Sequence, residues 1–164
     1  VRSGTAIDPI LHGGGQEAGR RSGTANVAGV VGMVAAMRAA DADRERFVSD
    51  IGSERTTFES ELERRLSVVV TAKTTERLPQ FSHVRFPGVE AENLLIRLDQ
   101  AGIHAAAGSS CQSGAIEPSH VLLAAGMTPV EAGECVRFSF GWDAKPGDGM
   151  RTATAVADVV EVMR

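Results

Sequence analysis

FSHVRF at residues 81–86 and VRFSFG at residues 136–141 have the pattern of β-strands. In both, the character of the side chains alternates along the chain, which is the period of a β-strand with two different faces. SVVVTAK at residues 67–73 is rich in β-branched residues and predicts another strand, and residues 103–107 predict a short one. The sequence therefore predicts a small sheet whose strands alternate with other elements.

Helical spacing occupies most of the remaining chain. Residues 25–40 are apolar on nearly every side, so the sequence predicts a helix that is largely buried. Residues 43–66 place apolar side chains on one face and charges on the other, which also predicts a helix. Further helical segments are predicted at residues 94–101, 118–126, 128–131 and 148–163. Helices first, then strands interleaved with helices, indicate an α+β fold.

The two ends of the chain differ in organisation. Residues 1–40 begin with a glycine-rich, irregular segment and continue into the apolar helix, which predicts part of a larger structure. Residues 41–164 contain all of the predicted strands with their helices, which predicts a compact two-layer domain. No internal repeat or obvious linker indicates a further division.

Composition narrows the class of protein. The 164 residues include 17 basic and 21 acidic side chains, a formal net charge of −4, which gives no reason to expect direct binding to nucleic acid. No apolar run approaches the length of a membrane span, and the polar, turn-rich start has no signal-peptide pattern. We therefore expect a cytoplasmic protein without membrane contact. Two cysteines without a CxxC or Cys/His cluster predict no metal site.

Cys111 lies in the segment GSSCQSG, residues 108–114, which is an unusual place for a structural cysteine. A structural thiol normally lies among apolar neighbours, whereas glycine and serine predict a mobile, solvated loop. A nucleophilic thiol has to be accessible and partly ionised, and such a loop allows both. Cys111 is therefore a candidate nucleophile or else an ordinary free cysteine. His104 and His120 are close in sequence, and each is either a base or a surface residue.

Thr24 lies in RRSGTAN, residues 20–26, where the chain enters the first predicted helix. Free backbone N–H groups, a hydroxyl and guanidinium groups suit a phosphate at a helix N-terminus. The pattern is neither a Walker loop nor GxGxxG, so by itself it favours Thr24 as the cap of the helix over a phosphate ligand.

Arg137 lies within the predicted strand VRFSFG and next to aromatic residues. It is therefore either on the solvated face of the sheet or aimed at a carboxylate. By alternation Cys135 shares the side of the strand that carries Arg137, and packing is the role that we predict for its thiol.

Taken together and in order, four segments resemble the C-terminal portion of cysteine desulfurases of the NifS/IscS type, within the class V aminotransferase superfamily. These segments are HGGGQEAGRRSGTANVAGVVG at 12–32, LPQFSHVRFPGVEAENLLIRLDQAGI at 78–103, GSSCQSGAIEPSHVLLAAGM at 108–127 and VRFSFG at 136–141. The resemblance implies the small C-terminal domain of a fold type I enzyme that uses pyridoxal phosphate. It implies an antiparallel or mixed sheet of about three or four strands packed against helices. Residues 1–40 would be the C-terminal tail of the large, cofactor-binding domain. Without the contacts of that domain, their apolar helix would be exposed, disordered or buried in a non-native pairing.

The resemblance also implies the chemistry of the site. Pyridoxal 5'-phosphate would form a Schiff base with L-cysteine, and Cys111 would attack the substrate sulfur, leaving L-alanine and an enzyme persulfide. Arg137 would hold the substrate carboxylate, and Thr24 would reach the phosphate of the cofactor in the partner subunit of a homodimer. The persulfide would pass to an acceptor protein such as an iron–sulfur scaffold, or serve tRNA thiolation.

The family binds its cofactor through a lysine in an S/A-x-H-K segment, and neither Lys73 nor Lys145 has that setting. We therefore expect that this chain alone holds no covalently bound cofactor and is inactive as a desulfurase. Two alternatives stay open: a stand-alone persulfide carrier or interaction module, and a related selenocysteine lyase.

Overall fold

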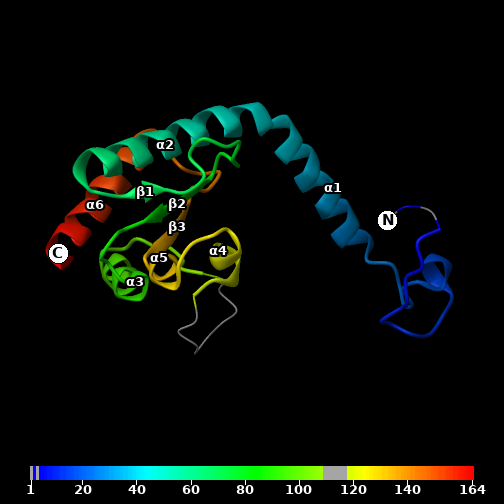
Figure 1. Cartoon of the computed structure of the whole chain (residues 1–164). Coiled ribbons are helices and arrows are strands. Elements are labelled where there is room, and N and C mark those ends of the chain that lie inside the picture. Colours follow the sequence, from blue (N-terminus) through cyan, green and yellow to red (C-terminus); the bar gives the residue numbers. More distant parts are fainter. Residues whose placement is uncertain (1, 3, 109–117) are drawn as a thin grey trace. The chain divides into compact units, whose positions relative to one another are not determined.

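The computed structural model describes residue 2, residues 4–108 and residues 118–164 (Figure 1). The chain divides into two compact units, Val1–Asp43 and Arg44–Arg164. The second unit contains the sheet with its helices, and the α+β fold that the sequence predicts is confirmed.

The first unit consists of a glycine-rich segment, a short 3-10 turn η1 (Gln16–Gly19) and helix α1 (Val27–Ala42). Asn26 caps α1, because its side chain accepts a hydrogen bond from the backbone N–H of Gly29 at 3.0 Å. The alternative in which Thr24 caps the helix is therefore wrong. The hydroxyl of Thr24 is not used to begin α1.

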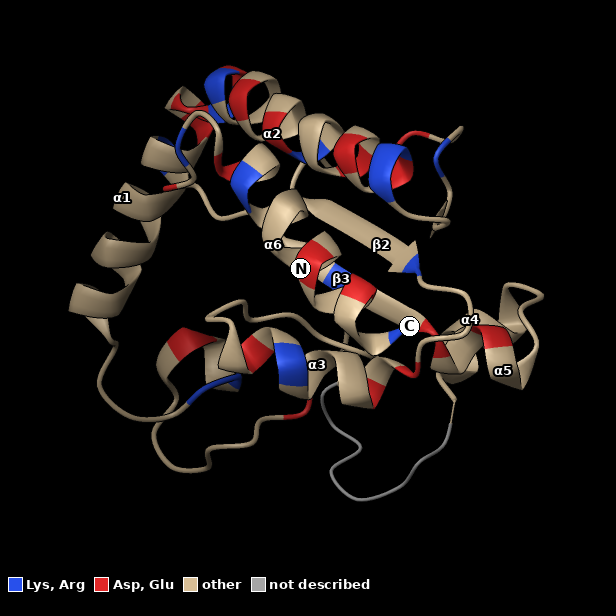
Figure 2. Cartoon of the chain, turned by 90° about the vertical axis from the view of Figure 1, so that its left-hand side faces the viewer, with Lys and Arg blue, Asp and Glu red and all other residues tan. Residues whose placement is uncertain are grey.

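The predicted burial of α1 is also wrong for this chain. Val27, Val31 and Met37 are 67%, 63% and 64% exposed, and α1 has no buried residue. Figure 2 shows most of the helix without charge. An apolar sequence predicts burial only if another element covers it, and the core cluster is drawn entirely from the second unit. Among the described residues, no helix, α1 included, is both long and apolar enough to cross a membrane.

The second unit is built on a three-stranded antiparallel sheet in the order β1 (Val69–Val70), β2 (Phe81–Arg85), β3 (Cys135–Ser139). β1 is much shorter than the strand predicted at 67–73, because the chain turns away after Thr71 and Ala72 adopts a positive φ of 54°. Instead of a strand at 103–107, a single bridge joins Ala106 to Arg137.

Helices cover one face of this sheet. α2 (Arg44–Arg65) and α6 (Asp148–Met163) lie side by side, and α3 (Ala91–Gln100) completes the layer (Figure 1). The shared core contains Phe58, Leu62, Leu94, Leu98, Val84, Val136, Val156 and Val160, each completely buried. Phe58 packs against Phe138 with the ring centroids 4.9 Å apart. Burying each of these large side chains stabilises the fold by roughly 1.5–3 kcal/mol.

The start of α6 approaches α2 closely enough to require glycine. Gly147 and Gly149 donate their backbone N–H groups to the carboxylate of Glu54, at 3.1 and 2.7 Å. A Cβ atom at Gly149 would lie 2.1 Å from the backbone oxygen of Glu54, which no side chain tolerates. Glu54 thus satisfies free N–H groups at the beginning of α6 from a neighbouring helix.

The segment between α3 and β3 contains the short helices α4 (His120–Ala124) and α5 (Pro129–Gly133). Thr128 and Glu131 form the predicted capping box, with the Thr128 hydroxyl accepting from Glu131 N and the Glu131 carboxylate accepting from Thr128 N. The capping box fixes the orientation of α5 directly before β3.

Candidate functional site

The sheet face that points away from the core carries the polar residues of β2 and β3. Because side chains alternate along a strand, Val84, Val136 and Phe138 face the core and the residues between them face outward. We call this second surface the outer face; it consists of Phe81, His83, Arg85, Cys135, Arg137 and Ser139.

Arg137 is exposed on the outer face, opposite His83 in the register of β2 and β3. Its Cζ atom lies 5.8 Å from the centroid of the Phe81 ring, a cation–π distance. Within the described part of the chain, no acidic side chain pairs with this guanidinium. A planar group held against a ring and left without a counter-ion is suited to bidentate binding of a carboxylate.

Arg85 lies on the same face, but unlike Arg137 it is paired with acidic side chains. Its Nε and Nη1 atoms donate to Glu134 and Glu131, at 2.7 and 2.5 Å. Hydrogen bonds from Thr128, followed by the influence of Arg85, lower the pKa of Glu131. Arg85 is therefore fully engaged in fastening α5 to β2, whereas Arg137 is available.

His83 lies directly across the strands from Arg137. Its Nδ1 atom is 2.9 Å from the hydroxyl of Thr71, and Thr71 donates its backbone N–H to the His83 carbonyl at 2.8 Å. Partial burial and the positive charge of Arg137 lower the pKa of His83. No role is predicted from the sequence for Phe81 or His83. The alternation of FSHVRF indicates only that both share one face of their strand, and the pairing of β2 with β3 brings that face beside Arg137.

Cys135 shares this face with Arg137, as alternation predicted, but is only 1% exposed. Its Sγ atom lies 3.2 Å from the carbonyl oxygen of Glu131 in α5. Burial raises the pKa of Cys135 to about 11. A buried thiol that resists ionisation packs rather than reacts, in agreement with the predicted role.

Cys111 and the rest of segment 109–117 lie outside the described residues, but the chain on either side is described. Before the segment, Arg137 N donates to Ala106 O at 2.7 Å and Ala106 N donates to Arg137 O at 3.0 Å. After the segment, α4 packs against α5. Cys111 follows Ala106 by five positions in the sequence.

Thr24 belongs to the first unit, where two glycine-rich motifs form one loop. Gln16 accepts from Gly23 N at 3.2 Å, and the Ser22 hydroxyl donates to Gly14 O at 2.7 Å. Arg21 donates to the carbonyl of Thr24 at 2.6 Å. The loop therefore holds Thr24 in an exposed position within the first unit, whereas Arg137 belongs to the second.

The remaining candidates are surface residues. His104 lies 3.2 Å from Asp99 and both side chains are largely exposed, while His120 is exposed at the start of α4. Lys73 forms an exposed ion pair with Glu63 at 2.7 Å, and Lys145 is exposed in the turn before α6. Among the described residues, no group of three or more His, Cys, Asp or Glu side chains could hold a metal ion.

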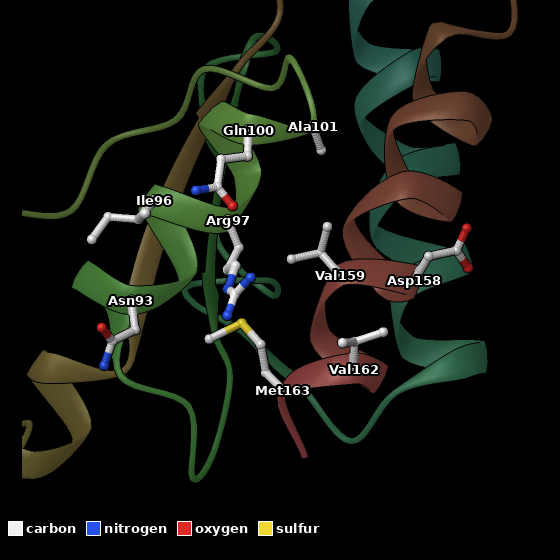
Figure 3. A pocket seen from close by; sticks show the side chains of 9 residues that line it. All are labelled: Asn93, Ile96, Arg97, Gln100, Ala101, Asp158, Val159, Val162 and Met163. Atoms are coloured by element: carbon white, nitrogen blue, oxygen red, sulfur yellow. The ribbon is translucent and has the colours of Figure 1, made fainter.

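A groove of about 960 Å³ between α3 and α6 contains none of the predicted site residues (Figure 3). Ile96, Val159 and Val162 supply apolar walls, and the guanidinium of Arg97 extends between the two helices (Figure 3). The groove and the outer face of the sheet have no lining residue in common.

Fold and site together define an α+β protein that presents an arginine without an acidic partner among the described residues on a sheet face, next to the chain that leads to a glycine- and serine-rich cysteine segment. The family model described as aminotransferase class-V matches residues 5–148. The chain belongs to the class V aminotransferase family, and the predicted resemblance to the cysteine desulfurases of this family is confirmed.

Individual relatives show which members of this family the chain resembles. The chain is 36% identical over its whole length to the cysteine desulfurase IscS of Dictyoglomus turgidum, of which it spans 42%. It is 39% identical over 85% of its length to the cysteine desulfurase NifS of Azotobacter vinelandii, of which it spans 35%. A solved NifS-like protein matches 99% of the chain with a TM-score of 0.83 and 26% identity, and the match covers 41% of that structure. The chain thus spans about two fifths of the length of the proteins that it matches.

Proposed function

We propose that this chain is the C-terminal part of a pyridoxal-phosphate-dependent cysteine desulfurase, which converts L-cysteine into L-alanine and an enzyme persulfide. In this proposal residues 1–40 are the tail of the large, cofactor-binding domain, and residues 41–164 are the small domain. The observation that supports this proposal is the guanidinium of Arg137, which has no acidic partner in the described part of the chain and is exposed on a sheet face next to the chain that leads to Cys111.

Arg137 would bind the carboxylate of L-cysteine. The described residues supply it with an aromatic ring and with no acidic partner, so a carboxylate finds the guanidinium uncompensated. Hydrogen bonds to charged groups contribute about 1.5–3 kcal/mol each, which is enough to orient a small amino acid. Arg85, two positions along the same face, has two carboxylates of its own and would take no part.

Cys111 would be the nucleophile. Its thiolate attacks the sulfur of the bound L-cysteine, an S–S bond forms, and the C–S bond of the substrate breaks with its electron pair left on carbon. That carbon takes a proton, so the products are L-alanine and a persulfide on Cys111. Cys135 is unsuited to the task, because its thiol is buried and its pKa is about 11.

The described residues include a group that suits the phosphate of the cofactor. Pyridoxal phosphate, when bound, supplies an electron sink for the carbon that loses sulfur. The exposed hydroxyl of Thr24, held by the loop of Gln16, Arg21 and Ser22, suits a phosphate, which we assign to the partner subunit of a homodimer. Lys73 is paired with Glu63 and Lys145 is exposed in a turn, so we assign the cofactor lysine to a part of the protein outside this sequence.

The destination of the sulfur is also part of the proposal. We assign it to a protein acceptor in the cytoplasm, such as an iron–sulfur scaffold, or to tRNA thiolation. A stand-alone persulfide carrier is the second candidate, and the absence of a suitable lysine from the sequence is the observation that favours it.

The test separates the two candidates with the chain itself. The chain is incubated with L-cysteine and pyridoxal phosphate, with and without a complete cysteine desulfurase, and the Cys111→Ser variant is the control. We expect no alanine from the chain alone, and alanine together with a Cys111 persulfide from a longer protein that contains this chain. A persulfide on Cys111 that forms only when a separate desulfurase is present would support the carrier. Alanine release by the chain alone would overturn the assignment of the lysine.

A further inference from the structure

The outer face holds a second polar group beside Arg137 that the proposed reaction does not yet use. His83 faces Arg137 across the two strands, and directly opposed side chains on one face of an antiparallel pair lie about 5 Å apart at Cβ. The charge of Arg137 is among the causes that lower the pKa of His83, which agrees with this proximity.

The imidazole of His83 is oriented from one side only. The Thr71 hydroxyl lies 2.9 Å from Nδ1, and the backbone bond from Thr71 N to His83 O fixes the same two residues at 2.8 Å. In the described part of the chain, no residue forms a hydrogen bond with Nε2. If Nδ1 accepts from the Thr71 hydroxyl, the neutral ring carries its proton on Nε2 and can donate it outward.

Phe81 supplies the third element of the arrangement. Its ring lies under the Arg137 guanidinium at 5.8 Å and belongs to the same strand as His83, two positions earlier. A guanidinium stacked on a ring keeps its in-plane N–H donors free. Arg137 and Arg85 are the charged groups of this face, and the charge of Arg85 is neutralised by Glu131 and Glu134.

We propose that His83 is a second ligand of the carboxylate that Arg137 binds, donating through Nε2–H, and that Phe81 is a positioning residue for the guanidinium. This inference rests on the proposed role of Arg137 and makes it more specific. A carboxylate would be held by a charged and a neutral donor from adjacent strands, whereas a neutral amide would lose the charge-assisted part of the binding.

The test uses the isotope-labelled chain and propionate as the probe, with propionamide as the uncharged control at constant ionic strength. We expect propionate, and not propionamide, to shift the NMR signals of the Arg137 side chain and the His83 ring with one saturation curve. The ¹⁵N shifts of His83 should show a protonated Nε2 and an unprotonated Nδ1. Bound propionate should raise the pKa of His83, because a carboxylate favours the protonated ring.

Variants test the proposed role of His83 separately from that of Arg137. His83→Phe should weaken propionate binding about tenfold, whereas His83→Gln, whose amide can still donate, should stay within about threefold. Thr71→Val, which removes only the anchor of Nδ1, should weaken it about threefold and alter the ¹⁵N shifts of the ring. Phe81→Leu should weaken binding while the His83 shifts are retained.

Different outcomes would overturn the role of Arg137 and the role of His83. If Arg137→Gln leaves propionate affinity unchanged, the proposed role of Arg137 is wrong and the inference falls with it. If Arg137→Gln abolishes binding but His83→Phe and Thr71→Val do not weaken it, only the role of His83 is wrong. A His83 ring with its proton on Nδ1 in the presence of propionate would also overturn that role.

Discussion

Ala106 and Arg137 exchange two backbone hydrogen bonds, at 2.7 and 3.0 Å, on the edge of β3 that does not pair with β2. The residue whose guanidinium is available for a carboxylate is thus also the residue that anchors the chain five positions before Cys111. In the proposed reaction, the residue that binds the substrate carboxylate and the chain that leads to the sulfur-accepting thiol are therefore both attached to β3.

The two cysteines should differ strongly in reactivity. Because the pKa of Cys135 is about 11, only roughly a thousandth of its thiol is ionised at pH 8. We expect the native Cys111→Ser variant to resist iodoacetamide at this pH and to become labelled in concentrated urea, as followed by mass spectrometry. Labelling of native Cys135 at the rate of a free thiol would contradict the packing role.

Gly149→Ala should destabilise the second unit by about 1–3 kcal/mol, because the new Cβ would collide with the Glu54 backbone and push α6 away from α2. The free energy of unfolding from urea titration measures the effect. Gly133→Ala, at the end of α5 with open space around its Cβ position, is the matched control and should change stability little. Equal effects at the two positions would show that the contact with Glu54 is unimportant.

Ser82→Ala should raise the stability of the chain by about 1 kcal/mol. Ser82 is completely buried in β2, and its hydroxyl has no hydrogen-bond partner among the described residues. Removing a buried hydroxyl without a partner removes the cost of its desolvation. The midpoint of urea unfolding should rise for Ser82→Ala and stay constant for Ser139→Ala on the exposed side of β3. A lower midpoint for Ser82→Ala would indicate an undetected partner of the hydroxyl.

The free energy of unfolding should decrease as the pH is lowered below about 6.5, because the unfolded chain protonates His83 more readily than the folded chain does. Partial burial and Arg137 lower its pKa in the folded chain, so between the ordinary value and the lowered one the unfolded chain binds more protons. The free energy of unfolding should therefore decrease from pH 7.5 to 5.5, and His83→Gln should reduce that decrease. Arg137→Gln should reduce it partly, because one of the two causes is gone.

Ser139→Ala, on the same face of the sheet as His83 but without a titratable group, is the control for this pH dependence. The free energy of unfolding of this variant should follow that of the unmodified chain across the range. If His83→Gln leaves the pH dependence of unfolding unchanged, the environment of His83 is not as described.

Local signals in the sequence were sufficient for several elements. Helix α6 has the predicted bounds, 148–163, and the capping box at Thr128 begins α5 as predicted. Both depend on interactions within one turn of chain. β1 is shorter than predicted because the length of a strand depends on the partner that continues to pair with it.

The motifs of the sequence by themselves determined the family, the α+β class, and the importance of Thr24, Cys111 and Arg137 as candidates. They could not determine which arginine of the sheet is available. Arg85 and Arg137 both stand in alternating strands, and Arg85 is neutralised by acids 46 and 49 residues away in sequence. The folded structure shows that Arg137 is the available one, that α1 is exposed and that His83 lies beside Arg137. The sequence could not show these properties, because charge compensation and burial depend on groups that folding brings together from distant parts of the chain.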